Sequence, residues 1–545
     1  MTLAGELLRE QQELETYRGT WDNHWQEIAE VVLPREANFR QHNEPGEKRT
    51  EKVFDSTAII GLERFAAALE SMITPRTQQW HGLEASNPDV QKDREVRLWM
   101  EDVTKILFRW RYKTRGNFAS QIHENWMSLG AFGTGSIFTD QLDSGGVRYK
   151  SIFLGDSYIA QNHQGIVDTY FRKFRITAHA ANTKKEWAGR LPKQIAEAKN
   201  PYQRFEFLHV VKPRSEVDPF RPDGRGMPWA SYYVSVEGQE MLDEGGYRSF
   251  PYAISRYVTT NDEVYGRSPA MAALPDIKML NQMSKTDIRA VHKLVDPPLL
   301  LHNDGIFGSG GMNVDMRPGG LTYGGVSSEG RQLIQPLQTG ARVDIAEEKM
   351  NRRRQTINDA FLVTLFQILV DNPRMTATEA LIRLQEKGAL ITPAMGRQQS
   401  EMIGPMIERE IEILQSQGLI PPLPDLLVEA RGEYEIIYTS PLSRLQRAEE
   451  VTGIQRTLDI IAPFAQIDPS ILLAFNPSEI VRIAANVNGV PERAMRSEAE
   501  VSRILAQQER DRRQAQQAAI IQPAASAAKD LAQAQAELSV GQQQR

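Results

Sequence analysis

Apolar residues recur every three or four positions through the first hundred residues, the spacing that places side chains on one face of a helix. The first series comprises Trp21, Trp25, Ile28 and Val32. It stops at Pro34, a second series runs from the capping residues Asp55 and Ser56 to just before Pro75, and a third covers about 90–112. We predict three helices here, with their aromatic side chains serving as core anchors.

From residue 130 the pattern changes to short alternating segments separated by Gly, Asp and Asn. These segments read GAFGTGSIFTDQL, VRYKSIFLGDSYIA, GIVDTYFRKFRIT, FEFLHVVKP and MPWASYYVSVEG. Such segments are typical of strands joined by turns, so we predict an α+β domain that extends to about residue 260. The string GAFGTG lacks the GxGxxG spacing of a dinucleotide loop and precedes a strand, which favours a turn or bulge.

A long helix is predicted over about 269–294. Ser268 is a suitable N-cap, and Pro269 occupies the first helical position, where a missing N–H costs nothing. The apolar face comprises Ala270, Leu274, Ile277, Ile288, Val291 and Val295. Pro275 either kinks this helix or marks its true start, and the helix is closed by the Asp-Pro-Pro run that begins at residue 296.

A Gly-rich region at 296–340 predicts short strands and tight turns, and a second long helix follows at about 343–365. Each long helix would measure about 35 Å at 1.5 Å per residue. The order is therefore a helix, a small β-rich insert and a second helix.

Proline residues divide the remaining chain. After a break at 371–380 we predict helix to about 417, interrupted at Pro393 and Pro405, and then a proline-rich linker. The segment 433–442 reads as a strand that returns to the α+β domain, and helix resumes beyond 443. The last forty residues are rich in Ala and Gln, which indicates disorder or a helix that needs a partner.

Composition describes an ordinary globular protein of several domains, with 545 residues and 61.6 kDa. The net charge of -6 argues against a general nucleic-acid coat but permits local cationic patches. There is no cysteine, so disulfides and thiolate chemistry are excluded. The N-terminus does not resemble a signal peptide, and the longest apolar stretch, 361–370, is too short to span a bilayer.

Motifs for enzymatic chemistry are missing from the sequence. It contains no GxxxxGK[ST], GxSxG or HExxH, and its nine histidines are scattered. Paired carboxylates such as Asp262-Glu263 and Glu347-Glu348 are common on solvated surfaces. We therefore expect no catalytic site, no metal site and no cofactor.

Cationic residues on the two long helices are the better candidates for function. They are Lys278, Lys285, Arg289 and Lys293 on the first helix, and Arg352, Arg353 and Arg354 on the second. Spacings of seven, four and four place the first four near one helical face. Two interpretations remain open: a solvated face that forms salt bridges between subunits, or a surface that contacts a phosphate backbone.

An ordered set of segments resembles the head-to-tail connector (portal) proteins of T7-like short-tailed bacteriophages. It includes WDNHWQEIAEVVLPREANF, GAFGTGSIF, RYVTTNDEVYGRSPAMAALPDIKMLNQM, RPGGLTY and MTATEALIRLQEKGALI, and it spans roughly 20–440. The resemblance implies a portal architecture with the following parts: a wing (1–268 and 381–440), stem helices (269–295 and 343–365), a clip (296–342), a tunnel loop (366–380), a crown (441–520) and a tail (521–545). The tunnel loop would present Asp371, Asn372, Pro373, Arg374 and Met375.

The resemblance also implies a function without covalent catalysis. The chain would form a ring, usually a dodecamer, at one capsid vertex of the virion, after assembly in the host cytoplasm and without a membrane. Double-stranded DNA would pass through its channel during packaging and ejection. The implied partners are the large subunit of the terminase, a tail adaptor, and the major capsid and scaffolding proteins.

Two other classes of protein are weighed against this interpretation. One is a metal-dependent nuclease that processes phage DNA, which would need clustered carboxylates. The other is an internal structural scaffold protein, which the Ala- and Gln-rich tail suits but the β-rich insert does not. A ring with a central hole in negative stain would separate the portal interpretation from both.

Overall fold

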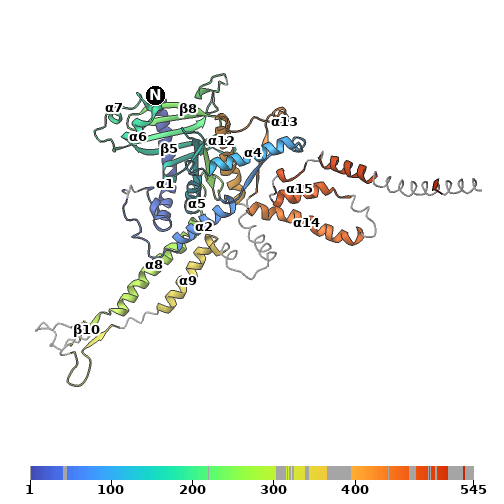
Figure 1. Ribbon diagram of the computed structural model, residues 1–545. Helices are drawn as coiled ribbons and strands as arrows, with labels where there is room; N and C mark the ends of the chain where they lie inside the picture. The colour runs from blue at the N-terminus through green and yellow to red at the C-terminus, as the bar shows by residue number, and fades with distance from the viewer. Residues whose placement is uncertain are drawn as a thin grey trace, which may run out of the picture. The chain divides into compact units, whose positions relative to one another are not determined.

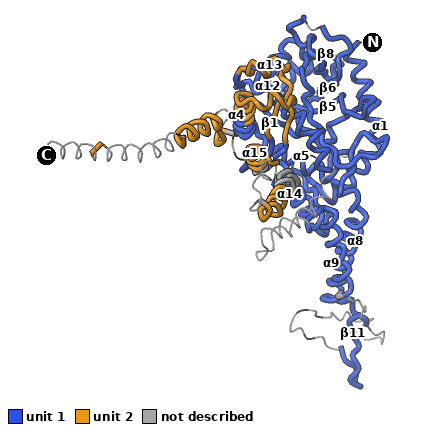
Figure 2. Tube along the Cα trace, turned by 90° about the vertical axis from the view of Figure 1, so that its right-hand side faces the viewer, with its two compact units in different colours: residues 1–81, 105–421, 438–446 blue, residues 82–104, 422–437, 447–545 orange. Residues whose placement is uncertain are grey.

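The computed structural model describes residues 2–40, 44, 46–218, 220–301, 315, 317, 321, 325–337, 343–364, 394–439, 441–465, 474–488, 490, 492–496, 500–513 and 532–533. The chain divides into two compact units, coloured separately in Figure 2. Unit 1 comprises residues 1–81, 105–421 and 438–446, and unit 2 comprises 82–104, 422–437 and 447–545. The mixture of helices and sheets confirms the α+β prediction.

Within its described residues, the two larger sheets of unit 1 are antiparallel and face each other. A three-stranded sheet has the order β3 (Val147–Ile152), β2 (Thr134–Gln141) and β9 (Tyr252–Arg256). A five-stranded sheet has the order β4 (Ser157–Gln161), β5 (Val167–Thr177), β6 (Arg204–Pro213), β7 (Trp229–Ser235) and β8 (Glu240–Tyr247). Tyr170 of β5 stacks on Tyr252 of β9 with ring centroids 3.8 Å apart, so the two sheets share a core.

Helices cover both faces of the five-stranded sheet (Figure 1). The side chains of α1 (Leu3–Val32) pack on one face with Leu208 and Val210 of β6, and those of α6 (Ala178–Thr183) and α7 (Lys193–Ala196) pack on the other with Phe207. Because successive strand residues point to opposite faces, β6 contributes to both cores. This explains why its sequence reads as a nearly continuous apolar run rather than a strict alternation.

Glycines allow α5 (Phe118–Phe132) to pack closely on α2 (Thr57–Ile73). A Cβ on Gly130 would lie 2.6 Å from Leu62 of α2, so only glycine permits this approach. Gly133 then ends α5 in the left-handed conformation, with φ of 78°, and β2 begins at Thr134. The GAFGTG string is therefore a close-packed helix-to-strand junction, and its first three residues belong to the helix rather than to the predicted strand.

The two long helices lie side by side and run away from the sheets of unit 1 (Figures 1 and 2). They are α8 (Pro269–Val295) and α9 (Val343–Ala360), which confirms both predicted helices, although α9 ends five residues early. The helix α8 starts at Pro269, so Pro275 lies inside it and does not mark its start. Between the helices, β10 (Leu299–Leu301) pairs with β11 (Ile334–Pro336).

The predicted interruption at Pro405 is wrong, because helix runs from 394 to Ser416. The chain instead makes a π-helical turn at Gln399–Ile403, immediately before α12 (Gly404–Ser416). Gly404 N–H bonds to the carbonyl of Gln399, five residues back. Because Pro405 has no N–H to offer, this wider turn keeps the helix continuous.

Unit 2 contains mainly helices. Its segments belong to β1 (His81–Ala85), α3 (Pro88–Gln91), α4 (Arg94–Arg111), α13 (Asp425–Glu429), β12 (Tyr434–Tyr438), α14 (Pro441–Ala465) and α15 (Pro477–Asn488), of which β1, α4, β12 and α14 cross its boundaries. The helix predicted over 90–112 is split, because the Asp93 carboxylate accepts from the N–H groups of Glu95 and Val96 and starts a new helix.

The strand predicted at 433–442 forms, but its predicted destination is wrong. Strand β12 pairs with β1 in a separate two-stranded sheet instead of joining the larger sheets of unit 1. Its partner β1 has the sequence HGLEA, whose short mixed pattern did not indicate a strand. The predicted tail at 521–545 lies outside the described residues except for 532 and 533.

Candidate DNA-facing surface on the helical pair

The predicted cations of α9 are mostly bound within the chain. Arg353 forms an ion pair with Asp276 of α8, and Arg354 binds the Asp55 carboxylate through Nε at 3.0 Å and Nη2 at 2.9 Å. Arg352 pairs with Glu348 one turn earlier on its own helix. Arg353 and Arg354 therefore hold the helical pair together and to the body, which is a structural use of their charge.

The proximal cations of α8 also have partners. Lys278 forms an ion pair with Glu27 of α1, and the Lys285 ammonium lies 5.1 Å from the centroid of the Phe54 ring, in cation–π contact. Both contacts join α8 to elements of the N-terminal region. They leave these two lysines less available to another molecule than their spacing alone indicated.

Arg289 and Lys293 differ from the other five predicted cations. Both side chains are exposed, and neither has an ion-pair or hydrogen-bond partner among the described residues. They lie in the last three turns of α8, beyond Ser284, its last buried residue. These two residues are the part of the predicted cationic stripe that remains available for contact with phosphate or with a second chain.

The apolar face predicted for α8 is buried only in its proximal half. Ala270, Leu274 and Ile277 are buried, whereas Ile288 and Val295 are 45% and 80% exposed. The three-or-four spacing correctly placed these residues on one face. Burial of the distal part of that face would require another surface.

The predicted tunnel-loop residues, Asp371, Asn372, Pro373, Arg374 and Met375, lie outside the described residues, as does most of the predicted clip. Their placement in a channel stays a prediction.

Sequence reasoning missed the acidic and amide partners of the cations. Asp55, Asp276, Glu27 and Asn281 position the helical pair through bonds to residues far away in the chain. No local spacing links Asp276 to Arg353, which are 77 residues apart. The only local signal concerned Asp55, which was predicted as a cap of α2 and does accept from Thr57 N–H at 2.9 Å.

The root of α8 is fixed by polar bonds to the α5–β2 junction. The Ser268 hydroxyl accepts from Met271 N–H at 3.0 Å and donates to the Ala131 carbonyl at 2.8 Å, so the helix cap is also an anchor. Gly266 N–H donates to the Thr134 hydroxyl at 2.8 Å. A side chain on Gly133 or Gly266 would overlap the carbonyl of the other glycine, so both glycines are needed for this approach.

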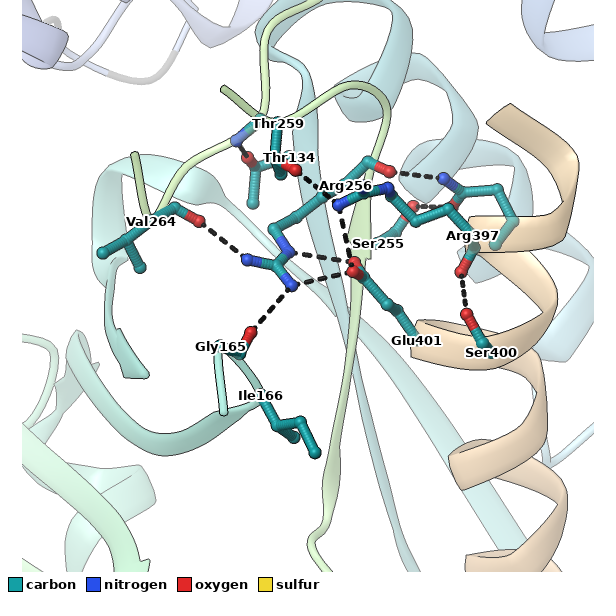
Figure 3. A network of polar contacts seen from close by, with 12 residues as sticks. Thr134, Gly165, Ile166, Ser255, Arg256, Thr259, Val264, Arg397, Ser400 and Glu401 are labelled. Atoms are coloured by element: carbon teal, nitrogen blue, oxygen red, sulfur yellow. Dashed lines mark hydrogen bonds and ion pairs between the residues drawn. The ribbon is translucent and has the colours of Figure 1, made fainter. Parts of the chain in front are cut away.

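A second network braces the segment that leads into α8 (Figure 3). Glu401, in the π-helical turn, binds Arg256 of β9 through two bonds of 2.9 and 2.7 Å. Arg397 donates to Glu401 at 3.2 Å and to the Thr259 hydroxyl at 2.6 Å. Arg256 also donates to the Val264 carbonyl, so one carboxylate organises both ends of the connection from β9 to α8.

A buried ion pair fixes α12 against the three-stranded sheet. Arg111 and Glu410 have side chains 0% and 1% exposed, and Tyr149 of β3 donates to Glu410 at 2.7 Å. Burial raises the pKa of Tyr149 well above its usual value, with the Glu410 charge adding to the shift, so the phenol stays protonated and can donate. These groups stabilise the body and lie apart from the cationic stripe.

The described residues show neither a metal-binding cluster nor a membrane-spanning helix. Among the described residues, no group of three or more His, Asp or Glu side chains is placed to hold a metal ion. Within those same parts of the chain, no helix combines the length and apolar character that crossing a bilayer requires.

Comparison with known proteins gives a consistent result along the whole chain. The probable portal protein of Bordetella phage BPP-1 is 28% identical and covers 96% of this chain and 94% of its own length. The portal protein of Salmonella phage epsilon15 is 25% identical and covers 97% and 95%. A chain from the virion of a native gene transfer agent (GTA) particle aligns with 74% of this chain and 86% of its own length at 13% identity, but its TM-score of 0.32 is too low to support a common fold.

The family comparison covers both units and the helical pair. The model of the bacteriophage head to tail connecting protein family matches residues 4–495. The chain therefore belongs to the bacteriophage head to tail connecting protein family.

Proposed function

We propose that the chain is the subunit of a phage portal: a homo-oligomeric ring, of twelve copies by resemblance, at one vertex of the capsid. Duplex DNA would enter and leave through its channel. The observation that carries this proposal is the family match over residues 4–495, together with two relatives named as portal proteins over nearly their full lengths. These comparisons favour neither the nuclease nor the internal scaffold protein.

The surface of the helical pair supports a role in assembly. Ile288, Leu294 and Val295 are 45%, 48% and 80% exposed, and large apolar side chains on one stretch of helix are suited to contact with a neighbouring chain. A ring forms when one surface of a subunit binds a different surface of the next and the rotation closes. We propose that the contacts between neighbouring subunits are made by the predicted wing, stem, clip and crown, into which the two units are divided.

In this proposal the protein performs no covalent chemistry, and the terminase supplies the energy for packaging. A channel must let DNA slide, so dense cationic contact would impede it. Arg289 and Lys293, repeated in every copy, could guide the duplex with few phosphate contacts per subunit. The terminase large subunit, a tail adaptor, and the major capsid and scaffolding proteins are the proposed partners in a virion assembled in the host cytoplasm.

Negative-stain microscopy of the purified chain tests the assembly directly. We expect rings with a central hole, whereas monomers or filaments would contradict the proposal. Deletion of 520–545 should leave the rings intact, because this Ala- and Gln-rich segment has little apolar surface to bury.

Charge reversal tests the DNA-guiding role. We expect Arg289→Glu with Lys293→Glu to reduce DNA packaged per particle while rings still form; the pair Lys285→Glu with Arg289→Glu, which also disturbs the Phe54 contact, should do the same. The matched control is Lys193→Glu with Lys199→Glu, an equal charge change on exposed residues of the body. Loss of rings in the helical variants would favour salt bridges between subunits instead.

A further inference from the structure

A short turn before α2, Lys52–Asp55, contacts both helices of the pair. The Asn281 side chain, in the middle of α8, accepts from Phe54 N–H at 2.8 Å and from Asp55 N–H at 3.0 Å through the same Oδ1. Its Nδ2 donates to the Lys52 carbonyl at 3.1 Å. Asn281 is 8% exposed, so these bonds satisfy its amide in a place where little water can.

The Asp55 carboxylate connects this turn to two further helices. Oδ1 accepts from Thr57 N–H at the start of α2, and Oδ2 accepts from Arg354 of α9. Burial alone would raise the pKa of Asp55, but the bonds from Thr57 and Arg354 outweigh burial and lower it. The carboxylate is therefore charged when it holds Arg354, and charge-assisted bonds of this kind are the stronger ones.

Two flanking contacts hold the turn itself. Lys285 of α8 lies over the Phe54 ring, and Lys52 forms an ion pair of 2.7 Å with Glu30 of α1. The turn is thus attached to α1, α2, α8 and α9 at once. The contacts with the helical pair described above are polar or cation–π in character.

The turn contacts α8 near the end of the buried part of the helix. Asn281 and Ser284 are the last buried residues of the helix, and the eleven residues from Lys285 to its end are half-buried or exposed. We propose that the turn Lys52–Asp55, gripped by Asn281 and Arg354, is a positioning latch that fixes the angle at which α8 and α9 leave the body.

The consequence for the channel rests on the proposed function. The distance from Asn281 to the end of α8 is about 20 Å at 1.5 Å per residue, so a tilt of about 10° at the latch moves that end by about 4 Å. In a ring, the same tilt in every copy changes the width enclosed by the distal helices. The latch therefore sets the bore at the level of Arg289 and Lys293.

Spin-label distances within one chain test the latch. Because the chain has no cysteine, Gln194→Cys in α7 and Leu294→Cys near the end of α8 can be labelled without background. Labelled chains are diluted in excess unlabelled chain, so the measured distance is intramolecular whatever the assembly. We expect Asn281→Leu with Arg354→Met to shift and broaden the distance distribution, because the latch is removed while side-chain size is kept.

The matched control is Arg352→Met, which removes a neighbouring arginine whose ion-pair partner among the described residues, Glu348, lies on its own helix. An unchanged distribution in the latch variant, or equal broadening in the control, would overturn the proposal. The single variants Asn281→Leu and Arg354→Met are measured beside the double variant, with circular dichroism as the check that each chain is folded. Absence of rings would count against the proposed portal function but would leave this distance measurement valid. The portal function and the latch can therefore be contradicted independently of each other.

Discussion

Arg111 in the body and Arg289 on distal α8 show two different uses of the same side chain. Arg111 is fully buried, binds Glu410 through two nitrogens, and lies 4.6 Å from the Trp80 ring centroid. Arg289 is exposed and has no partner among the described residues. A buried charge without a partner costs several kcal/mol, whereas an exposed charge keeps its water. Pairing within the chain therefore marks structural cations, and exposure marks those available to another molecule.

Removal of Arg111 should give the largest effect on stability. Arg111→Met leaves Glu410 buried and uncompensated, and we expect a loss of about 3–5 kcal/mol of folding free energy. Arg109→Met, at an exposed position on the same helix, is the control. Urea midpoints compare the two variants, and equal midpoints would contradict the distinction drawn above.

Gly133 at the root of α8 allows a sharper test, because Gly165 has the same φ of 78° in open space. Gly165→Ala should cost about 1 kcal/mol from backbone strain alone. Gly133→Ala should cost clearly more, because its Cβ would also overlap the Gly266 carbonyl. Thermal unfolding of both variants measures the difference, and equal losses would mean that the two backbones can separate cheaply.

His209 in the core between the sheets should make stability depend on pH. Burial, with the charges of Arg172 and Lys184, holds the pKa of His209 well below its usual value of 6.5. The unfolded chain then binds a proton that the folded chain does not, so stability falls as pH drops below about 6.5, by at most about 1.4 kcal/mol per pH unit.

The measurement is the melting temperature at pH 8 and pH 5. Wild type should lose more on acidification than His209→Gln, whose amide can still reach Tyr252 and Ser231, the present partners of the ring. His163→Gln, at an exposed position, should behave like wild type. Parallel losses in wild type and His209→Gln would show that His209 does not contribute.

The parts of the fold that local chemistry determines could be predicted from the sequence. Ser268 and Pro269 indicated the residue at which α8 starts, because a cap and an N1 proline act within one turn, although Pro275 left a second start open. Alternation and turn residues indicated most strands of both large sheets, whereas β8 and β9 were covered only by the predicted extent of the domain to about 260. The interruption of the helix predicted at Pro405 was wrong, because a π-helical turn accommodates a proline that an α-helix would not.

The candidate site could be predicted only in part, because its partners are distant in sequence. The cations of the helical pair were identified, but Arg354 and Asp55 are 299 residues apart, and nothing in either local pattern indicates that they meet. The periodicity of α8 likewise shows which residues share a face and not whether that face is covered. Ile288 lies on the predicted face and is 45% exposed.

The smallest effect on stability is expected at the distal cations, and it completes the contrast with Arg111. Arg289→Met with Lys293→Met should change the folding free energy by no more than about 0.5 kcal/mol, because each removes an exposed charge without a partner among the described residues. The same variant should lower the DNA packaged per particle, since two phosphate-attracting charges are lost in every copy. A clear loss of stability in the isolated chain would show that these cations are structural after all, and the division between paired and available charges would then fail on α8.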